Sequence, residues 1–278
     1  MAKTTRGLAQ FARLPWFLLT YAGVVGFGAL FLLAGAATGT LPVFWQVWGA
    51  LLIVAPMWLA RYTFQLSKSA QRDLIEFAGA LAGLIDEFDP TTRRHSERVS
   101  RYAGLLAREL GLSKREIERA KTCGLLHDIG KIAVSQRDIV QKPGPLTEEE
   151  RALVALHADI GADILSSVQA FKDLAPIVRL HHERMDGRGY HRLMPGDVPL
   201  LARIVTVADA FDAMTSDRVY RPALNLEDAV TELDRHKGRQ FDPDIVRALN
   251  RLLERGELLP VTASVAEPTP ARAAPEYA

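Results

Sequence analysis

The stretch Ala120-Lys-Thr-Cys-Gly-Leu-Leu-His-Asp-Ile-Gly-Lys131 is the part of the chain on which the interpretation of the rest depends. His127 and Asp128 follow an apolar run, which predicts that they lie at a buried helix end. A neutral imidazole beside a carboxylate is a good ligand pair for a divalent metal, and we expect Gly130 to let the backbone turn next to it. Lys131 adds a compact cation where an anionic substrate would bind. Taken alone, the His-Asp pair fits a surface salt bridge better, so its meaning depends on residues elsewhere.

Composition excludes two classes of protein. The chain has 278 residues, with 34 basic and 33 acidic side chains and a net charge of +1. This balance gives no general attraction to a nucleic acid polymer, which we therefore exclude as a partner. The single cysteine, Cys123, excludes an intrachain disulfide framework, fits a reducing compartment, and is expected to be a small buried apolar residue.

Residues 1–61 are predicted to form a two-helix transmembrane hairpin. No charged residue occurs from Leu14 to Ala60. One helix of that length would be about 70 Å long, whereas the hydrocarbon core of a bilayer is about 30 Å thick. The sequence Thr38-Gly-Thr-Leu-Pro42 interrupts the run, so we predict two spans at about 16–37 and 42–60.

The flanking charges predict the orientation of this hairpin. Basic residues precede the first span and follow the second, and the loop between the spans has none: Lys3, Arg6, Arg13, Arg61, Lys68, Arg72. Both termini are therefore expected in the cytoplasm, in a multi-pass protein of the inner (cytoplasmic) membrane. A cleaved signal peptide is the alternative, with Ala34–Ala37 as its cleavage region, but the second span would survive cleavage.

Residues 62–88 are predicted to form a connecting helix. Apolar residues follow one another at intervals of 4-3-4-3-4: Ala70, Leu74, Phe77, Leu81, Leu84, Phe88. Such a heptad seam fits a parallel homodimer through residues 70–88, and it equally fits an amphipathic helix packed on its own domain. Gly79 and Gly83 weaken the coiled-coil alternative, and the sequence leaves both open.

Residues 89–258 are predicted to form an all-α domain. Ser113 with Glu116 and Thr147 with Glu150 have the pattern of capping boxes, and Asp242-Pro243 is typical of a helix start. Apolar residues follow these starts at helical spacing, for example Leu153, Leu156, Ile160 and Ile164, and strand-like alternation is scarce. Loops are expected at 133–146 and 185–199, and the tail 259–278 is expected to be disordered.

Histidines and aspartates recur along this domain at intervals of roughly one helix and one connection. They are His95, His127, Asp128, His157, His181, His182 and Asp209. Several helices would thus project ligands into one bundle core. Adjacent helical residues point about 100° apart, so the pairs 127–128 and 181–182 are expected to straddle two ions, with Asp128 able to bridge them. A set with no thiolate suits Fe, Mn, Zn, Co or Ni, and paired divalent ions promote displacement at phosphorus.

The motifs that contain these residues resemble the HD-GYP family of the HD phosphohydrolase superfamily. The matching stretches are His95-Ser-Glu-Arg-Val99, Leu126-His-Asp-Ile-Gly-Lys131, Lys142–Glu149, His157, His181–Tyr190, Ala202–Asp209 and Asp212–Arg221. The resemblance implies an HD-type α-helical bundle that hydrolyses cyclic di-GMP to pGpG or GMP. It also suggests a diguanylate cyclase-type partner protein and favours iron or manganese over zinc, cobalt and nickel.

The resemblance assigns roles residue by residue. All seven histidines and aspartates named above correspond to ligands of a two-metal site, and Asp128 corresponds to the bridge. His127, Asp128 and Lys131 are the expected catalytic residues, and Lys131, Arg218 and Arg221 the expected substrate-binding residues.

Two positions depart from the family pattern. Thr91 replaces the glutamate that members with a third metal carry, so two ions are expected. His191 replaces the proline of Gly-Tyr-Pro, where proline would stiffen the loop. The alternatives are therefore the same fold acting on another cyclic dinucleotide or nucleotide phosphate, and a catalytically weak signalling or binding module.

Overall fold

The computed structural model describes residues 16–39, 42–88, 94–133, 147–217 and 222–260. Within these ranges every regular element is helical, and the only β-type pairing is an isolated bridge between Lys237 and Phe241. The predicted all-α class is therefore confirmed for the described residues. The chain divides into two compact units, Met1–Arg72 and Asp73–Ala278.

The first unit contains α2 (Trp16–Thr38) and the beginning of α3 (Val43–Phe88). Gly39, with φ of 63°, follows α2 in the left-handed conformation that commonly terminates helices. Both helices begin within a residue of the predicted spans. α3 continues unbroken for 46 residues, so the second predicted span and the predicted connecting segment 62–88 are parts of one helix, and the division at residue 61 stays a prediction. Nothing after Ala60 breaks a helix, and Pro56 is accommodated inside it.

Apolar side chains cover these two helices. Phe27, Leu33 and Trp58 are 72%, 69% and 64% exposed. Within the described residues, only the helix over Val47–Leu84 is long and apolar enough to cross a bilayer, and Val25–Thr38 forms a shorter apolar helix. The two-span hairpin is not confirmed by these helices.

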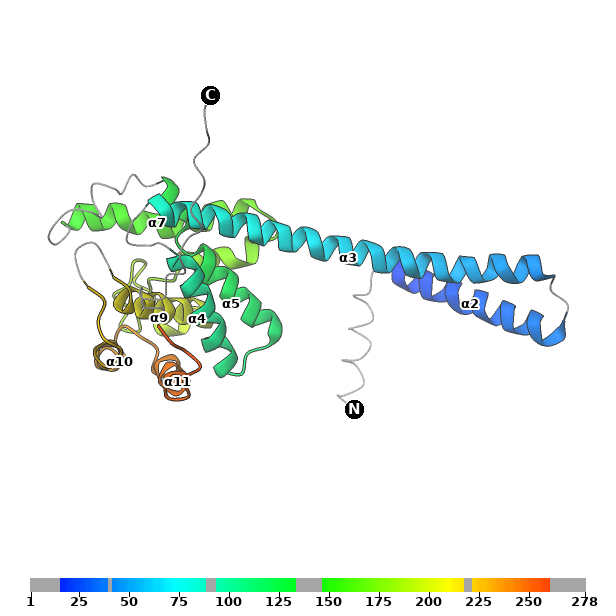
Figure 1. Ribbon diagram of the computed structural model, residues 1–278. Coiled ribbons are helices and arrows are strands. Elements are labelled where there is room, and N and C mark those ends of the chain that lie inside the picture. Colours follow the sequence, from blue (N-terminus) through cyan, green and yellow to red (C-terminus); the bar gives the residue numbers. More distant parts are fainter. Residues whose placement is uncertain (1–15, 40–41, 89–93, 134–146, 218–221, 261–278) are drawn as a thin grey trace, which may run out of the picture. The chain divides into compact units, whose positions relative to one another are not determined.

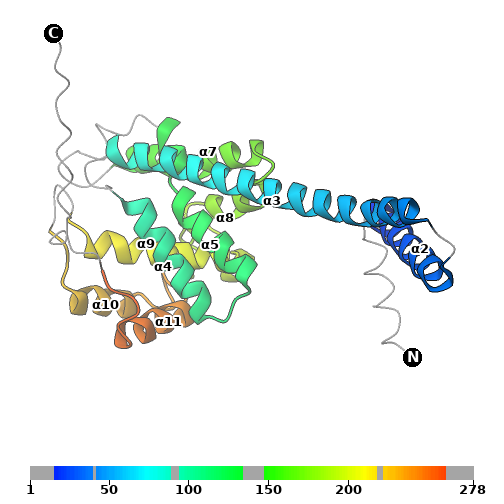
Figure 2. The ribbon, with the colours of Figure 1, turned by 45° about the vertical axis from the view of Figure 1, so that its right-hand side comes forward.

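The second unit is a bundle whose centre is formed by α4 (His95–Glu109), α5 (Lys114–Leu126) and α9 (Leu200–Thr215), which pack against one another (Figure 1). Tyr102 of α4 meets Phe211 of α9 edge to face, with ring centroids 5.3 Å apart. Outside this centre lie η1 (Ile129–Ala133), α7 (Glu148–Ser167), η2 (Lys172–Leu174), α8 (Ala175–Arg179), η3 (Pro195–Asp197), α10 (Leu226–Arg235) and α11 (Pro243–Glu254). α7 packs on η1 and α8, whereas α10 and α11 pack on α9 (Figure 2).

The predicted helix starts are confirmed. Ser113 and Glu116 form a reciprocal capping box at α5, and Thr147 and Glu150 form another at α7. Asp242 caps α11 by accepting the N–H of Asp244. These local hydrogen bonds satisfy amides that have no partner in the first helical turn.

The apolar residues noted at helical spacing in α7 do not all face the core. Leu153 and Leu156 are 47% and 45% exposed, whereas His157, Ala158 and Gly161 are buried. Small residues face inward because η1 approaches α7 so closely that a Cβ on Gly130 would lie 2.0 Å from the His157 carbonyl oxygen. A row of leucines would not fit in that space.

The C-terminal part of α3 packs on its own domain. Ala78 and Ala82 are buried in the core, and a Cβ on Gly79 would lie 3.1 Å from Leu125 of α5. Phe77 and Leu84, two members of the predicted seam, are 62% and 55% exposed. The amphipathic-helix alternative therefore describes this segment, and a homodimer through residues 70–88 stays a prediction.

Candidate metal centre

The structure brings the seven predicted ligands together from five parts of the bundle. His95 is the first residue of α4, His127 follows the end of α5, His157 lies within α7, and Asp209 lies within α9. His181 and His182 lie in the turn after α8, which ends at Arg179.

One group of donors consists of His95, His127 and Asp209, whose ligand atoms all lie within 4.8 Å of one another. The Nε2 atoms of His95 and His127 are 3.3 Å apart, and His95 Nε2 lies 3.3 Å from Asp209 Oδ1. A tetrahedral or octahedral ion accepts this mixture of imidazole nitrogen and carboxylate oxygen.

A second group consists of His157, His181 and His182, again with all ligand atoms within 4.8 Å. The rings of His181 and His182 lie 4.0 Å apart by centroid, and His157 Nε2 is 3.4 Å from His181 Nε2. Both residues lie in the turn after α8 and contribute to this group. His181 also forms a compact set with His127 and Asp128, so the expectation that the pair 181–182 straddles two ions stays a prediction.

Asp128 lies between the two groups. Its Oδ2 atom is 3.3 Å from His127 Nε2, and its Oδ1 atom is 3.4 Å from His157 Nε2. Asp128 also forms a compact set with His127 and His181. One carboxylate with an oxygen directed to each side is the arrangement that a bridging ligand requires.

The tautomers of the rings fit metal binding. The Nδ1–H groups of His127, His157 and His181 donate to the backbone carbonyls of Gly124, Val154 and Val178 at 2.9, 2.6 and 2.5 Å. A carbonyl only accepts, so each of these rings, when neutral, directs its Nε2 lone pair into the centre. Two such lone pairs facing each other at 3.4 Å repel, and a cation between the donors removes that repulsion. At His127 burial favours the neutral ring, but Asp128 and Asp209 outweigh it and raise the pKa.

The two groups differ in protonation. Burial, reinforced by neighbouring imidazoles, lowers the pKa of His182 to about 3 and that of His181 well below its usual range. At His95 burial also favours the neutral ring, but Asp209 and Asp212 outweigh it and raise the pKa to about 9. The second group is therefore neutral and ready to bind a metal at pH 7, whereas His95 must release a proton first.

The remaining predicted site residues and the other histidines lie outside the two donor groups or outside the described residues. Lys131 Nζ donates to Asp128 Oδ2 at 2.5 Å, so its charge lies beside this carboxylate. Arg218, Arg221 and Thr91 lie outside the described residues. His191 joins neither donor group, and the surface residue His236 pairs with Glu232 at 3.1 Å.

The profile described as "HD domain" matches residues 79–245, which is more than half of the chain. The chain belongs to the HD domain family. The resemblance inferred from the motifs is thereby confirmed, and the match begins within α3, which agrees with the packing of that helix on the domain.

Curated relatives of this HD domain are cyclic dinucleotide phosphodiesterases. The chain is 40% identical over 175 residues to "3'3'-cGAMP-specific phosphodiesterase 3" of Vibrio cholerae, which covers 63% of this chain and 38% of the relative. It is 42% identical over 179 residues to the "cyclic di-GMP phosphodiesterase response regulator RpfG" of Xanthomonas campestris, covering 63% of this chain and 47% of that one. The chain thus spans less than half the length of these relatives.

A solved structure shares the fold of the HD domain. Bd1817 of Bdellovibrio bacteriovorus, described as an HDG"Y"P protein, aligns with a TM-score of 0.51 at 23% identity and covers 67% of this chain and 64% of its own. At this identity the likeness establishes the helical fold and nothing about activity.

Sequence reasoning missed Asp212 as a functional residue of the HD domain. This buried carboxylate accepts the Nδ1–H of His95 at 2.8 Å, and it accepts hydrogen bonds from Nε and Nη2 of Arg98 at 2.6 and 2.9 Å. It therefore orients a ligand without contacting the metal position. The signal was available, since Asp212 lies three residues after Asp209 and Arg98 three after His95, each on the same helical face.

Gly130 is needed for a different reason from the backbone turn that the sequence suggested. Its φ is not positive, so the backbone needs no glycine for a turn. Glycine is required because the His157 carbonyl and the Gly161 amide occupy the place of a side chain, at 2.0 and 2.5 Å from an ideal Cβ. This contact holds η1, which begins directly after Asp128, against the helix that carries His157.

Proposed function

We propose that this chain is a membrane-anchored, metal-dependent phosphodiesterase that hydrolyses cyclic di-GMP to pGpG or GMP. The observation that carries the proposal is the pair of three-residue donor groups with Asp128 between them. The names of the curated relatives support the substrate class.

The proposed roles follow from the two donor groups. His95, His127 and Asp209 would hold one ion, His157, His181 and His182 would hold the other, and Asp128 would contribute a carboxylate oxygen to each. When bound, two divalent ions, with iron or manganese favoured over zinc, cobalt or nickel, supply water activation and neutralise charge at phosphorus.

The protein's own contribution is electrostatic positioning. Burial favours the protonated carboxyl, yet His127 and Lys131 hold the pKa of Asp128 well below its usual range. The Asp128 carboxylate is therefore ionised at neutral pH. Lys131 places its ammonium group beside that carboxylate and is proposed to stabilise charge that develops on the phosphate oxygens. Arg218 and Arg221 are proposed to bind the second phosphate of the substrate.

The test measures metal content and turnover on the same sample. The full chain is purified in detergent without oxygen or chelators, and we expect two ions per chain and conversion of cyclic di-GMP. The double variant His127→Ala/Asp128→Ala should lose metal and reduce turnover to background, whereas His236→Ala, a histidine outside the centre, serves as the matched control. Unchanged hydrolysis in the double variant contradicts the proposal.

A second candidate substrate is 3'3'-cGAMP, because a relative of similar identity is named for it. A panel of cyclic dinucleotides and nucleotide phosphates in competition with cyclic di-GMP separates the two. Tight binding of cyclic di-GMP by metal-loaded protein without turnover of any panel member would instead favour a signalling or binding module.

The membrane anchor, the homodimer and the cyclase-type partner belong to the proposal as well. The apolar stretch within Val47–Leu84 supports an anchor, and the basic flanks support cytoplasmic termini. Reporter fusions at Gly39 and at the C-terminus test the topology. We expect only the Gly39 fusion to report an extracytoplasmic location, and a cytoplasmic Gly39 would contradict the two-span hairpin.

A further inference from the structure

Glu183 is a buried carboxylate directly after the ligand pair His181-His182. It is 2% exposed, and each of its oxygens accepts a backbone N–H: Oε1 from His191 at 2.6 Å and Oε2 from Leu193 at 2.9 Å. A buried charge is costly unless it is hydrogen-bonded, and bonds to a charged acceptor are the stronger kind. These two bonds therefore explain how the carboxylate is tolerated there.

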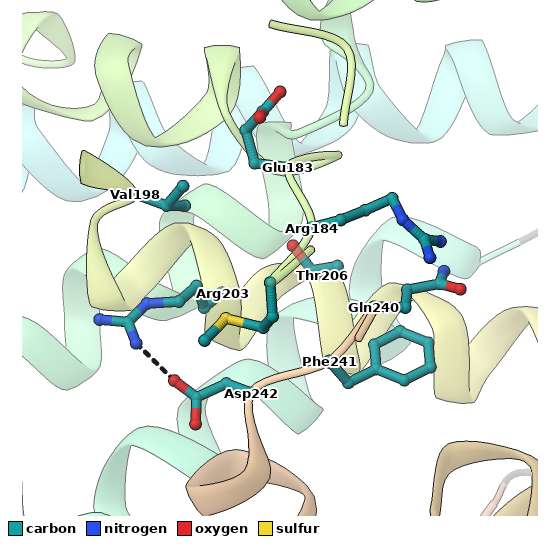
Figure 3. A pocket seen from close by; sticks show the side chains of 9 residues that line it. Glu183, Arg184, Val198, Arg203, Thr206, Gln240, Phe241 and Asp242 are labelled. Carbon is teal, nitrogen blue, oxygen red and sulfur yellow. Dashed lines mark hydrogen bonds and ion pairs between the residues drawn. The ribbon is translucent and has the colours of Figure 1, made fainter. Parts of the chain in front are cut away.

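The small pocket next to this turn does not account for the orientation of Glu183. That pocket is lined by residues 183–185 of this turn, by residues of α9 and by the segment before α11 (Figure 3). Arg203 and Asp242 form an ion pair in its lining at 2.5 Å. In Figure 3 the carboxylate of Glu183 points away from Arg203, Thr206 and Asp242. Its partners are the amides of the 184–193 loop.

The loop backbone is shaped around this carboxylate. A Cβ on Gly189 would lie 2.6 Å from Glu183 Cα and 2.7 Å from Glu183 Oε1, so only glycine fits. Arg192, between the two donor residues, has φ of 57°, a left-handed conformation that is unfavourable for a residue other than glycine. Amides that converge in this way form an anion-binding nest, and here the anion is a side chain of the same chain.

Tyr190 is the residue that this folding places at the metal centre. Its ring centroid lies 4.7 Å from that of His182 and 6.3 Å from that of His157, and the side chain is 43% exposed. The ring thus borders two ligands on one side and solvent on the other. We propose that Glu183 is a positioning residue, which holds the 184–193 loop closed so that Tyr190 forms a wall of the substrate site; this rests on the proposed phosphodiesterase function.

In this arrangement, the replacement of proline by His191 supplies a backbone hydrogen-bond donor to Glu183. Proline has no N–H and would remove one of the two donors to Glu183. The imidazole contributes less, because its Nε2 has no hydrogen-bond partner among the described residues and the nearest carboxylate oxygen, on Asp159, is 3.7 Å away. The backbone amide of His191, not its ring, is the part on which the loop depends.

The test compares His191→Pro, which removes the amide donor, with His191→Ala, which removes only the ring. Amide exchange of residues 185–199 and tryptic cleavage after Arg184, Arg188 and Arg192 measure loop opening in the full chain, without substrate. We expect about tenfold or greater acceleration in His191→Pro and Glu183→Gln, corresponding to one hydrogen bond to a charged group, and a rate near the parent value in His191→Ala. The double variant Glu183→Gln/His191→Pro should be no worse than the more severe single variant, because both changes break the same bond.

Kinetics then test the role of Tyr190. We expect Glu183→Gln to keep its bound metal and to raise KM severalfold more than it lowers kcat. The inference would be overturned if His191→Ala and His191→Pro opened the loop equally, or if the effects in the double variant were additive. It would also be overturned if Glu183→Gln left amide exchange unchanged or lost its metal. Absence of turnover in the parent chain contradicts the phosphodiesterase proposal instead, and the exchange and cleavage rates distinguish the two failures.

Discussion

At the scale of single residues, the candidate metal centre depends on side chains that orient the ligands. Asp212 holds His95 by its Nδ1–H and is itself held by Arg98, so three side chains from α4 and α9 form one hydrogen-bonded chain. At His127, His157 and His181 backbone carbonyls perform the same task. His95 is thus the ligand whose orientation depends on a carboxylate that substitution can remove.

Asp212→Asn is expected to lower metal affinity about 10- to 100-fold while leaving the fold intact. The amide keeps the size of the side chain but loses the charge that pairs with Arg98 and favours the Nδ1–H tautomer of His95. Calorimetric titration of the chelator-treated full chain with Mn²⁺ measures the change. Asp163→Asn, at a side chain that is 74% exposed, is the control, and equal affinities in the two variants would contradict a positioning role for Asp212.

At the scale of elements, the close packing of η1 against α7 brings the donor groups together. η1 follows the His127-Asp128 pair, α7 carries His157, and Gly130 faces Gly161 where they touch. The bridge made by Asp128 depends on this contact, because a wider spacing would move His157 away from Oδ1.

Gly130→Ala is therefore expected to destabilise the protein by about 1–3 kcal/mol, as overpacking of a tight contact does. Urea unfolding of the full chain gives the free-energy change, and the same samples should bind less metal. Gly196→Ala is the matched control, since nothing lies within 4 Å of its Cβ position and its φ is not positive. If Gly130→Ala were as stable as this control, the close-contact explanation would be wrong.

At the scale of the whole molecule, ion pairs join segments that are far apart in the chain. Glu109, the last residue of α4, accepts hydrogen bonds from Arg251 at 2.6 Å and from Arg255 at 2.5 Å, across 142 and 146 residues. Hydrogen bonds from Arg255 and Arg251 lower the pKa of Glu109 to about 2. The carboxylate is therefore more acidic in the folded than in the unfolded chain.

Because the folded pKa is depressed, this contribution to stability is present above the unfolded pKa, about 4.5, and is lost as the pH falls through about 2. Glu109→Gln should reduce the free energy of unfolding near pH 7 by less than about 1 kcal/mol, because both arginines are partly solvent-exposed. Thermal unfolding from pH 7 to pH 3 should show the difference from the parent shrinking with acid. The exposed Glu254→Gln serves as control, and a difference that grows with acid would contradict the assignment.

Much of this protein was determined by short-range sequence signals. Capping boxes and Asp242-Pro243 located helix starts because they act through hydrogen bonds within one turn. The seven predicted donors, which the structure brings together, could be recognised for a similar reason. Imidazole and carboxylate groups that recur at intervals of about one helix indicate a candidate metal site in the core of a bundle. The uncharged run of Leu14–Ala60 likewise predicted apolar helices.

Tertiary structure decided the rest. Contacts between residues far apart in the chain decide which donors share a group and which face of α7 points inward. They also decide the unbroken course of α3 and the attachment of His95 to Asp212, which are 117 positions apart. No local pattern shows that a Cβ at position 130 would lie 2.0 Å from the His157 carbonyl oxygen, which is why glycine is required there. Nor does one show that the His191 amide donates a hydrogen bond to Glu183. The sequence by itself determined which donors and helices the protein has, because these are properties of neighbouring residues; only packing decided where the donors meet, because that is a property of the folded core.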